Sequence, residues 1–294
     1  MSYKNTIFTG VGTALITPFK NGKIDYFSLE RLIEFQIQGG ASAIILLGTT
    51  GEASTICEKE RCKMIAFANE KIKNRVPLIV GCGTNNTEVS IRYSKKAKEL
   101  GSSAVLLVTP YYNKTTKEGI IKHYEKIASA VSLPIILYNV PSRTGFNIPV
   151  SAYRELSQID NIVALKEASG SLSYLVEILD TCGENLDIYS GNDELTLPFL
   201  SLGGKGVISV CSNAFPSYMA RLCKAFFNND LPLARKMQIE LTPLVKQMFA
   251  EVNPIPIKYA CSYLDLCQNE LRLPLCQSTK EAEIAPVLEH FKSL

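Results

Sequence analysis

The sequence contains no tryptophan and only two histidines, His123 and His290, in 294 residues. Neither histidine has the spacing to a second ligand that a protein metal site requires. Each lies in a helix-like stretch beside a charged residue, Lys122 or Glu289, so we expect both imidazoles on the solvated surface. The chain is therefore expected to carry out its chemistry without a histidine base and without a metal ion.

Long apolar runs are missing as well, and no stretch approaches the roughly 18 residues of a membrane-spanning helix. Residues 1–20 lack the pattern of a secretory signal. The nine cysteines form an odd set without a CxxC pair, which indicates buried free thiols rather than disulfides or a zinc site. The net charge of +3 is spread without a dense basic run, so neither nucleic acid nor a membrane is indicated as a partner. We expect a cytoplasmic protein.

Eight short segments, mostly rich in Ile, Val and Leu, recur at intervals that leave room for a helix between them. The segments are Val11–Ile16, Ala43–Leu47, Leu78–Cys82, Val105–Val108, Ile135–Tyr138, Ile162–Leu165, Asp187–Tyr189 and Val207–Val210. They lack the alternation of a half-exposed strand, which is typical of parallel strands buried on both faces.

The stretches between these segments are amphipathic and carry helix-start and helix-end signals, as in Phe27–Gln38, Glu58–Lys73 and Thr87–Leu100. Eight alternations of strand and helix predict an α/β fold, the (β/α)8 TIM barrel. The rival is a doubly wound open sheet, which usually has a glycine-rich turn after its first strand. This chain has Ile16-Thr17-Pro18-Phe19 there, which favours the barrel.

The chain continues well beyond the last predicted strand, and this tail is helical in pattern. The predicted helices are Pro216–Phe227, Leu231–Phe249, Pro256–Tyr263 and Thr279–Lys292. The first of them can serve as the eighth helix of the barrel. We therefore predict a catalytic barrel over residues 1–229 and a C-terminal helical domain over residues 230–294.

The active site of such a barrel lies where the strands end, and one of these ends carries a lysine. Lys166 directly follows the apolar run Ile162–Leu165, so its side chain is expected to project into the barrel mouth. An ammonium loses hydration there, which favours the neutral amine that can attack a ketone and form an imine. The alternative is a structural lysine that pairs with Glu167 or caps the strand.

Imine chemistry also needs a route for protons and a group that holds the substrate. Tyr138 ends the neighbouring strand, and Thr49 or Thr50 could pass its proton onward. Arg143 follows Tyr138 closely and could hold a carboxylate with its forked donors. Each of these residues also has a structural interpretation, as a packed tyrosine or an ordinary loop arginine.

Several motifs at these strand ends resemble those of the dihydrodipicolinate synthase family, within the superfamily of pyruvate-dependent class I aldolases and N-acetylneuraminate lyases. The matching segments are residues 48–52 (GTTGE), 108–113 (VTPYYN), 138–145 (YNVPSRTG), 163–170 (VALKEASG), 190–193 (SGND), 206–209 (GVIS) and 253–258 (NPIPIK). The superfamily shares the turn after strand 2 and the strand-6 lysine. The arginine in the segment 138–145 favours the synthase.

The resemblance implies that Lys166 forms a Schiff base with pyruvate and that the resulting enamine attacks aspartate 4-semialdehyde. The product would be 4-hydroxy-tetrahydrodipicolinate, at the first committed step of lysine and diaminopimelate biosynthesis, with no cofactor. A proton relay of Thr49, Tyr138 and Tyr112 is implied, in which Tyr112 reaches in from a neighbouring subunit. Such an enzyme would be a homotetramer, with at least a dimer needed for activity.

The same resemblance implies how the substrates are held. Thr50 would bind the carboxylate of pyruvate, and Arg143 that of the semialdehyde. Gly191 and Ile208 would line the site with backbone carbonyls.

Lysine-inhibited members of the family have an allosteric pocket at a subunit interface. The corresponding positions are Ala53, Ser54, Glu58, Arg61, Asn85 and Tyr111. Glu58 and Arg61 stand where two histidines are expected, and the expected acidic residue is displaced or missing around residues 87–89. We therefore expect weak or absent feedback by lysine.

Two alternatives remain. An N-acetylneuraminate lyase or another pyruvate-dependent aldolase would keep Lys166 and Tyr138 but has less use for Arg143. A non-catalytic barrel would be expected to have lost at least one member of the set Lys166, Tyr138, Thr49 and Arg143, and all four are present.

Overall fold

The computed structural model describes residues 5–294, in which eight parallel strands close into a barrel. The strands are β1 (Gly10–Ala14), β4 (Ala43–Leu46), β5 (Leu78–Gly81), β6 (Ala104–Val108), β7 (Ile135–Asn139), β8 (Ile162–Glu167), β9 (Asp187–Ser190) and β10 (Gly206–Ser209). They correspond one to one with the apolar segments of the sequence. The predicted (β/α)8 barrel is confirmed.

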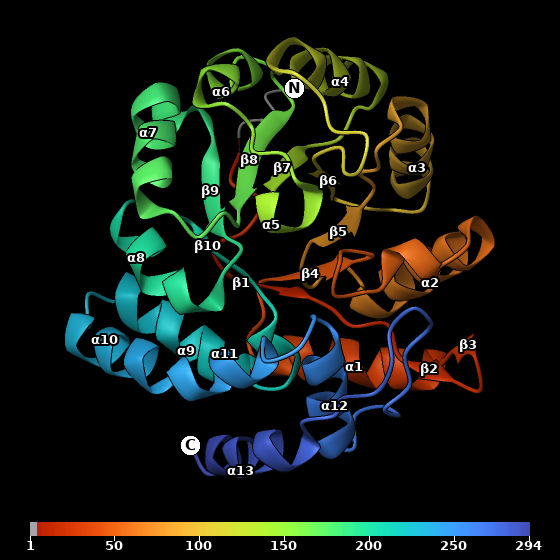
Figure 1. Cartoon of the computed structure of the whole chain (residues 1–294), viewed down its shortest axis with the longest axis vertical. Coiled ribbons are helices and arrows are strands. Elements are labelled where there is room, and N and C mark those ends of the chain that lie inside the picture. The colour runs from red at the N-terminus through yellow and green to blue at the C-terminus, as the bar shows by residue number, and fades with distance from the viewer. Residues whose placement is uncertain (1–4) are drawn as a thin grey trace.

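Helices surround this barrel, as Figure 1 shows. They are α1 (Tyr26–Gln38), α2 (Glu58–Ile72), α3 (Thr87–Glu99), α4 (Lys117–Ala130), α5 (Pro141–Thr144), α6 (Val150–Leu156), α7 (Leu172–Cys182), α8 (Thr196–Ser201) and α9 (Pro216–Phe227). Several of these helices have a short polar side chain as N-cap. Asp25 accepts hydrogen bonds from backbone amides in the first turn of α1, and Asn86 accepts one from the first turn of α3. Four single-turn 3₁₀ segments follow strands or helices, at Ala53–Thr55, Gly183–Asn185, Asp193–Leu195 and Cys211–Asn213.

The core has two layers, one between strands and helices and one inside the barrel. Ile45, Ile79, Ile136 and Ile208 belong to the inner layer. Gly206 allows β10 to approach β1 closely, since a Cβ at that position would lie 1.9 Å from the Gly10 carbonyl oxygen. The inner layer therefore fills the barrel, and open space for a ligand is left at its mouth.

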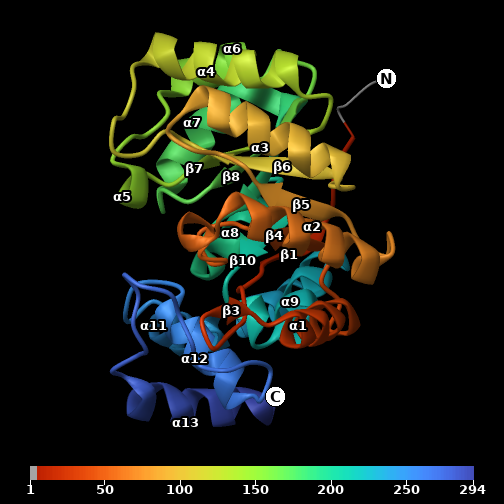
Figure 2. The ribbon, with the colours of Figure 1, turned by 90° about the vertical axis from the view of Figure 1, so that its right-hand side faces the viewer.

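The C-terminal region forms four helices, and Figure 2 shows α11, α12 and α13 together at one end of the molecule. They are α10 (Leu231–Glu240), α11 (Thr242–Met248), α12 (Ile255–Tyr263) and α13 (Glu281–Lys292). The prediction of one helix over Leu231–Phe249 was wrong. Pro243 has no amide hydrogen to donate to the preceding turn, so the helix ends and a new one starts. We propose the boundary between residues 229 and 230, ahead of α10, as the division between the catalytic barrel and the helical domain.

A small antiparallel hairpin, β2 (Phe19–Lys20) and β3 (Lys23–Ile24), follows β1 and was not predicted. The coil after α12 covers its turn, because the Glu270 carboxylate accepts hydrogen bonds from the backbone amides of Asn21 and Gly22. The C-terminal region is thus joined to the end of the first barrel strand.

The prediction of two surface histidines was right for His290 and wrong for His123. His123 lies on α4 with 7% of its surface exposed, and its Nδ1 is 2.9 Å from the Thr87 hydroxyl at the start of α3. Burial lowers the pKa of His123 to about 4. The residues next to His123 in the sequence do not indicate this burial, because it results from the packing of α3 against α4.

None of the nine cysteines, all of which lie within residues 5–294, forms a disulfide, and five of them are buried, whereas Cys57 and Cys276 are exposed. No helix within residues 5–294 is long and apolar enough to cross a membrane. The same residues hold no group of three or more His, Cys, Asp or Glu side chains that could bind a metal ion.

Candidate active site

Tyr138 and Lys166 face each other across the pair β7–β8 because of an irregularity lower in the sheet. Ile135 pairs with Ile162, and the register then shifts before Ile136. Beyond that shift Tyr138 pairs with Lys166, whereas the original register would have placed Leu165 opposite it. A local shift in strand pairing therefore brings the lysine and the phenol together.

Lys166 is buried at the mouth of the barrel, with 6% of its surface exposed. Its Nζ lies 4.3 Å from the centre of the Tyr138 ring. Within residues 5–294 its ammonium forms no ion pair. The interpretation of Lys166 as a structural lysine paired with Glu167 is wrong.

Glu167 points to the other face of β8 and is fully buried. Its carboxylate accepts hydrogen bonds from Asn139 Nδ2 at 2.8 Å and from the Ser169 backbone amide. Burial raises the pKa of Glu167, and these hydrogen bonds act against that rise. Since Asn139 ends β7, this contact ties together the strand ends that carry Tyr138 and Lys166.

Gly191 and Ile208 lie on the next two strand ends around the barrel. A Cβ at Gly191 would stand 3.1 Å from Lys166 Cε and 2.6 Å from the Ala168 side chain. The glycine therefore leaves space beside the lysine side chain. Ile208 packs in the inner core layer together with Tyr138.

Thr49 and Thr50 follow β4 in a tight turn. Thr49 lines the cavity, whereas Thr50 is buried and its hydroxyl accepts a hydrogen bond from Asn253 Nδ2 at 3.0 Å. The guanidinium of Arg143 donates to the Asn253 backbone carbonyl at 3.1 Å. Asn253 thus links the two residues predicted to hold carboxylates. The sequence motif 253–258 contained it, but no role followed from the motif alone.

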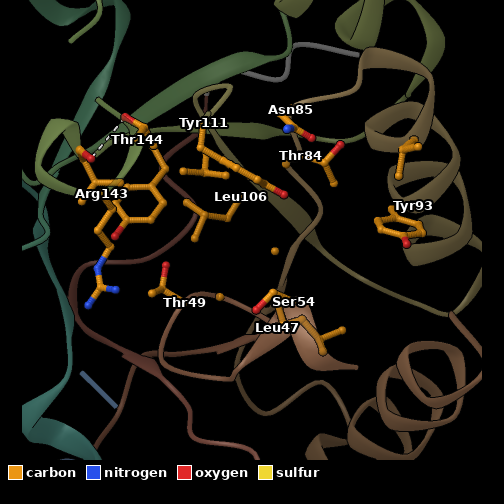
Figure 3. Close-up of a pocket in the computed structure, with 18 of the residues that line it drawn as sticks. Leu47, Thr49, Ser54, Thr84, Asn85, Tyr93, Leu106, Tyr111, Arg143 and Thr144 are labelled. Atoms are coloured by element: carbon orange, nitrogen blue, oxygen red, sulfur yellow. Dashed lines mark hydrogen bonds between the residues drawn. The ribbon is translucent and has the colours of Figure 1, made fainter. Parts of the chain in front are cut away.

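A cavity of about 670 Å³ opens at this end of the barrel. Thr49 and Arg143 lie toward one end of it, and Tyr93 lies at the other, as Figure 3 shows. Among the described residues that line it, Arg61 and Arg143 are the two with formal charge. The charged side chains of the lining are therefore both cations, which suits carboxylate ligands.

The wall of the cavity contains most of the predicted allosteric positions. The predicted positions among its lining residues are Ala53, Ser54, Arg61, Asn85 and Tyr111. Glu58 does not line it and instead pairs with Arg92 at 3.3 Å. The buried guanidinium of Arg61 lies 4.3 Å from the ring centre of Tyr93, a lining residue that sequence reasoning did not find.

Tyr112 stands apart from the other predicted residues. It is 92% exposed, has a left-handed backbone with φ of 67°, and does not line the cavity of its own chain. A strained, exposed tyrosine on the loop after β6 is typical of a residue that contacts a partner.

Comparison with known protein families identifies the family of this chain. The sequence pattern of the Dihydrodipicolinate synthetase family matches residues 7–288. The chain belongs to this family. A curated relative, 4-hydroxy-tetrahydrodipicolinate synthase from Clostridium novyi, is 47% identical over 92% of each chain. The family resemblance inferred from the motifs is confirmed, and the chain is a lyase-type enzyme.

Solved structures agree with this assignment. Dihydrodipicolinate synthase from Thermotoga maritima is 41% identical, with a TM-score of 0.96 over 98% of this chain and 100% of the other. The enzyme from Cyanidioschyzon merolae, solved with lysine bound, is 37% identical, with a TM-score of 0.94 over 99% and 100% of the two chains.

Proposed function

We propose that this chain condenses pyruvate with aspartate 4-semialdehyde, through a Schiff base on Lys166, to give 4-hydroxy-tetrahydrodipicolinate. The observation that carries the proposal is a buried lysine without an ion pair, beside a tyrosine ring 4.3 Å away, at the mouth of a barrel. The family supports the same reaction, since its members carry the name of this synthase. The step belongs to lysine and diaminopimelate biosynthesis.

The chemistry follows from these side chains. Once its ammonium has given up a proton, the Lys166 amine attacks the ketone of pyruvate, and loss of water gives an imine. The imine withdraws electrons, so a proton leaves the methyl group and an enamine forms. The enamine carbon then attacks the aldehyde carbonyl of the second substrate. Attack by the amino group of that substrate on the imine carbon closes the ring and releases Lys166.

Each proton transfer in this reaction needs a nearby acid or base. We assign this work to Tyr138, with Thr49 and Tyr112 as the next members of a relay. Tyr138 is supported by its position beside the lysine nitrogen, and Thr49 by its place in the cavity wall. Neither His123 nor His290 lines the cavity, so we assign the relay without a histidine.

The substrates carry carboxylates, and the cavity carries positive charge. We assign the pyruvate carboxylate to Thr50 and the semialdehyde carboxylate to Arg143, whose fork of donors suits a carboxylate. The contact of both residues with Asn253 supports their placement at one end of the site. Gly191 and Ile208 complete the wall beside Lys166 with backbone carbonyls.

We propose that the active form is at least a dimer and that the full assembly is a homotetramer. Tyr112 supports this, because its exposed phenol would complete the relay of a neighbouring chain. Leu172 and Val176 lie one turn apart on α7 with 38% and 49% of their surfaces exposed, which supports a second contact surface. The nine cysteines of the described residues form no disulfide, which supports a reducing compartment, the cytoplasm.

The choice of acceptor is tested by pyruvate consumption with aspartate 4-semialdehyde and, separately, with N-acetylmannosamine. The proposal expects consumption with the semialdehyde alone. Arg143→Ala should then raise KM for the semialdehyde and leave imine formation with pyruvate intact. Consumption with the sugar alone would instead make the chain a lyase of the N-acetylneuraminate type.

A further inference from the structure

The mechanism leaves one buried ion pair unused, between Lys258 of α12 and Glu52 after β4. Lys258 Nζ and Glu52 Oε1 are 2.8 Å apart, and the two side chains are 0% and 1% exposed. Burying two charges costs more free energy than an apolar pair of the same size would, so stability alone is a weak reason for this pair. A second function is therefore worth seeking.

The pair joins three parts of the chain. Lys258 Nζ also donates to the Thr17 carbonyl at 2.6 Å, beyond β1, and to the Glu270 carbonyl at 2.9 Å, in the coil after α12. The second oxygen of the Glu52 carboxylate accepts from the Arg272 backbone amide at 3.1 Å. All three ammonium hydrogens and both carboxylate oxygens have partners, so the contact is fixed in direction as well as in distance.

Glu52 is also the residue that closes the turn of the active site. Its backbone amide donates to the Thr49 carbonyl at 3.1 Å, and the Gly51 amide donates to the Gly48 carbonyl at 3.1 Å. Glu52 itself has a left-handed backbone, with φ of 53°, which is unfavourable for a residue with a side chain. The buried contact with Lys258 holds this conformation.

We propose that Lys258 and Glu52 are positioning residues, through which the C-terminal helical domain fixes the turn that presents Thr49 and Thr50. This role rests on the proposed function, in which these threonines relay a proton and bind pyruvate. It assigns the C-terminal domain a direct effect on the first substrate. Arg143 donates to the backbone carbonyl of Asn253, which the substitutions leave in place, and not to the side chain of Lys258 or Glu52, so the semialdehyde side of the site should respond less.

The test compares Lys258→Met with the double variant Lys258→Met/Glu52→Gln, which leaves no unpaired buried charge. Leu288→Ala is the matched control, because Leu288 is a fully buried core residue of α13 in the same domain. The measurements are the thermal midpoint, kcat, and KM for each substrate, at a temperature where every variant is folded.

If Lys258 and Glu52 position the turn, the double variant should be more thermally stable than Lys258→Met. Its KM for pyruvate should still be raised about tenfold or more over the wild type, because small displacements of binding groups are costly. Its KM for the semialdehyde should change much less. Leu288→Ala should lose stability with both KM values unchanged. If the double variant has wild-type kinetics, or loses only kcat in step with its folded fraction, the pair is merely structural and the proposal fails.

Borohydride trapping separates this inference from the proposed function. Wild type and both Lys258 variants should form a pyruvyl adduct on Lys166, with the variants needing more pyruvate. If the wild type is trapped and the variants need no more pyruvate than the wild type, the positioning role alone is overturned. A wild type that forms no adduct overturns the proposed function, and the positioning role with it.

Discussion

Lys166 and Tyr138 are register partners on β8 and β7, with the lysine nitrogen 4.3 Å from the centre of the tyrosine ring. This relationship couples the imine-forming nitrogen to a phenol that can supply and remove protons. Both side chains stand on one pair of hydrogen-bonded strands, which limits how far either can move from the other.

Tyr138→Phe removes the phenol and keeps the ring that packs beside Lys166. We expect kcat to fall by roughly 10²- to 10⁴-fold, the usual contribution of a positioned acid or base. Tyr124→Phe is the matched control, because its buried hydroxyl bonds to the Leu107 carbonyl on the outer side of the barrel. The control should lose stability without losing turnover, and equal activity of Tyr138→Phe and wild type would refute the relay.

The proposed donation of Tyr112 across an interface predicts subunit complementation. Tyr112→Phe and Lys166→Ala should each be nearly inactive, yet co-expression should restore activity, because one site of a mixed dimer combines an intact lysine with an intact tyrosine. Co-expression of Lys166→Ala with Tyr138→Phe is the control, since no intact site can form. Activity no greater than the sum of the separate variants would place Tyr112 outside the relay.

Lysine should leave the activity unchanged at millimolar concentration. The far end of the cavity carries the buried cation Arg61, which repels the second ammonium of lysine, and it has no acidic lining residue among those described. Val89→Glu adds a carboxylate to this lining and should increase the sensitivity to lysine. Inhibition of the wild type below millimolar lysine would contradict this expectation.

Stability should depend on the protonation of His123. Its pKa is about 4 in the folded chain against an ordinary 6.5, so the neutral form is favoured in the folded state. The resulting stabilisation is complete above pH 6.5 and is lost as the pH falls toward 4, by about 3 kcal/mol at most. The free energy of unfolding of His123→Gln should decline less over this range. Parallel curves for the two proteins would refute the assignment.

The sequence was sufficient for the barrel because buried parallel strands need continuous apolar runs, and each run ends near a polar residue of the site. It also placed Lys166 and Tyr138 on neighbouring strand ends. Their alignment depends on the register shift near Ile136, which comes from pairing between strands and leaves no local pattern.

Other features were hidden for the same reason. The contact of Asn253 with Thr50 joins residues that are far apart in the chain, and the cover over His123 comes from another helix. The break near Pro243 is the exception, because a proline that cannot donate to the preceding helical turn is a local signal in the sequence. Local patterns thus predicted elements and their ends, whereas contacts between distant segments required the structure.

The most direct test of the account is borohydride reduction of the protein in the presence of pyruvate, followed by peptide mass mapping. We predict one pyruvyl adduct, on Lys166, that disappears in Lys166→Ala. An unmodified Lys166, or an adduct on another lysine, would contradict the Schiff-base mechanism.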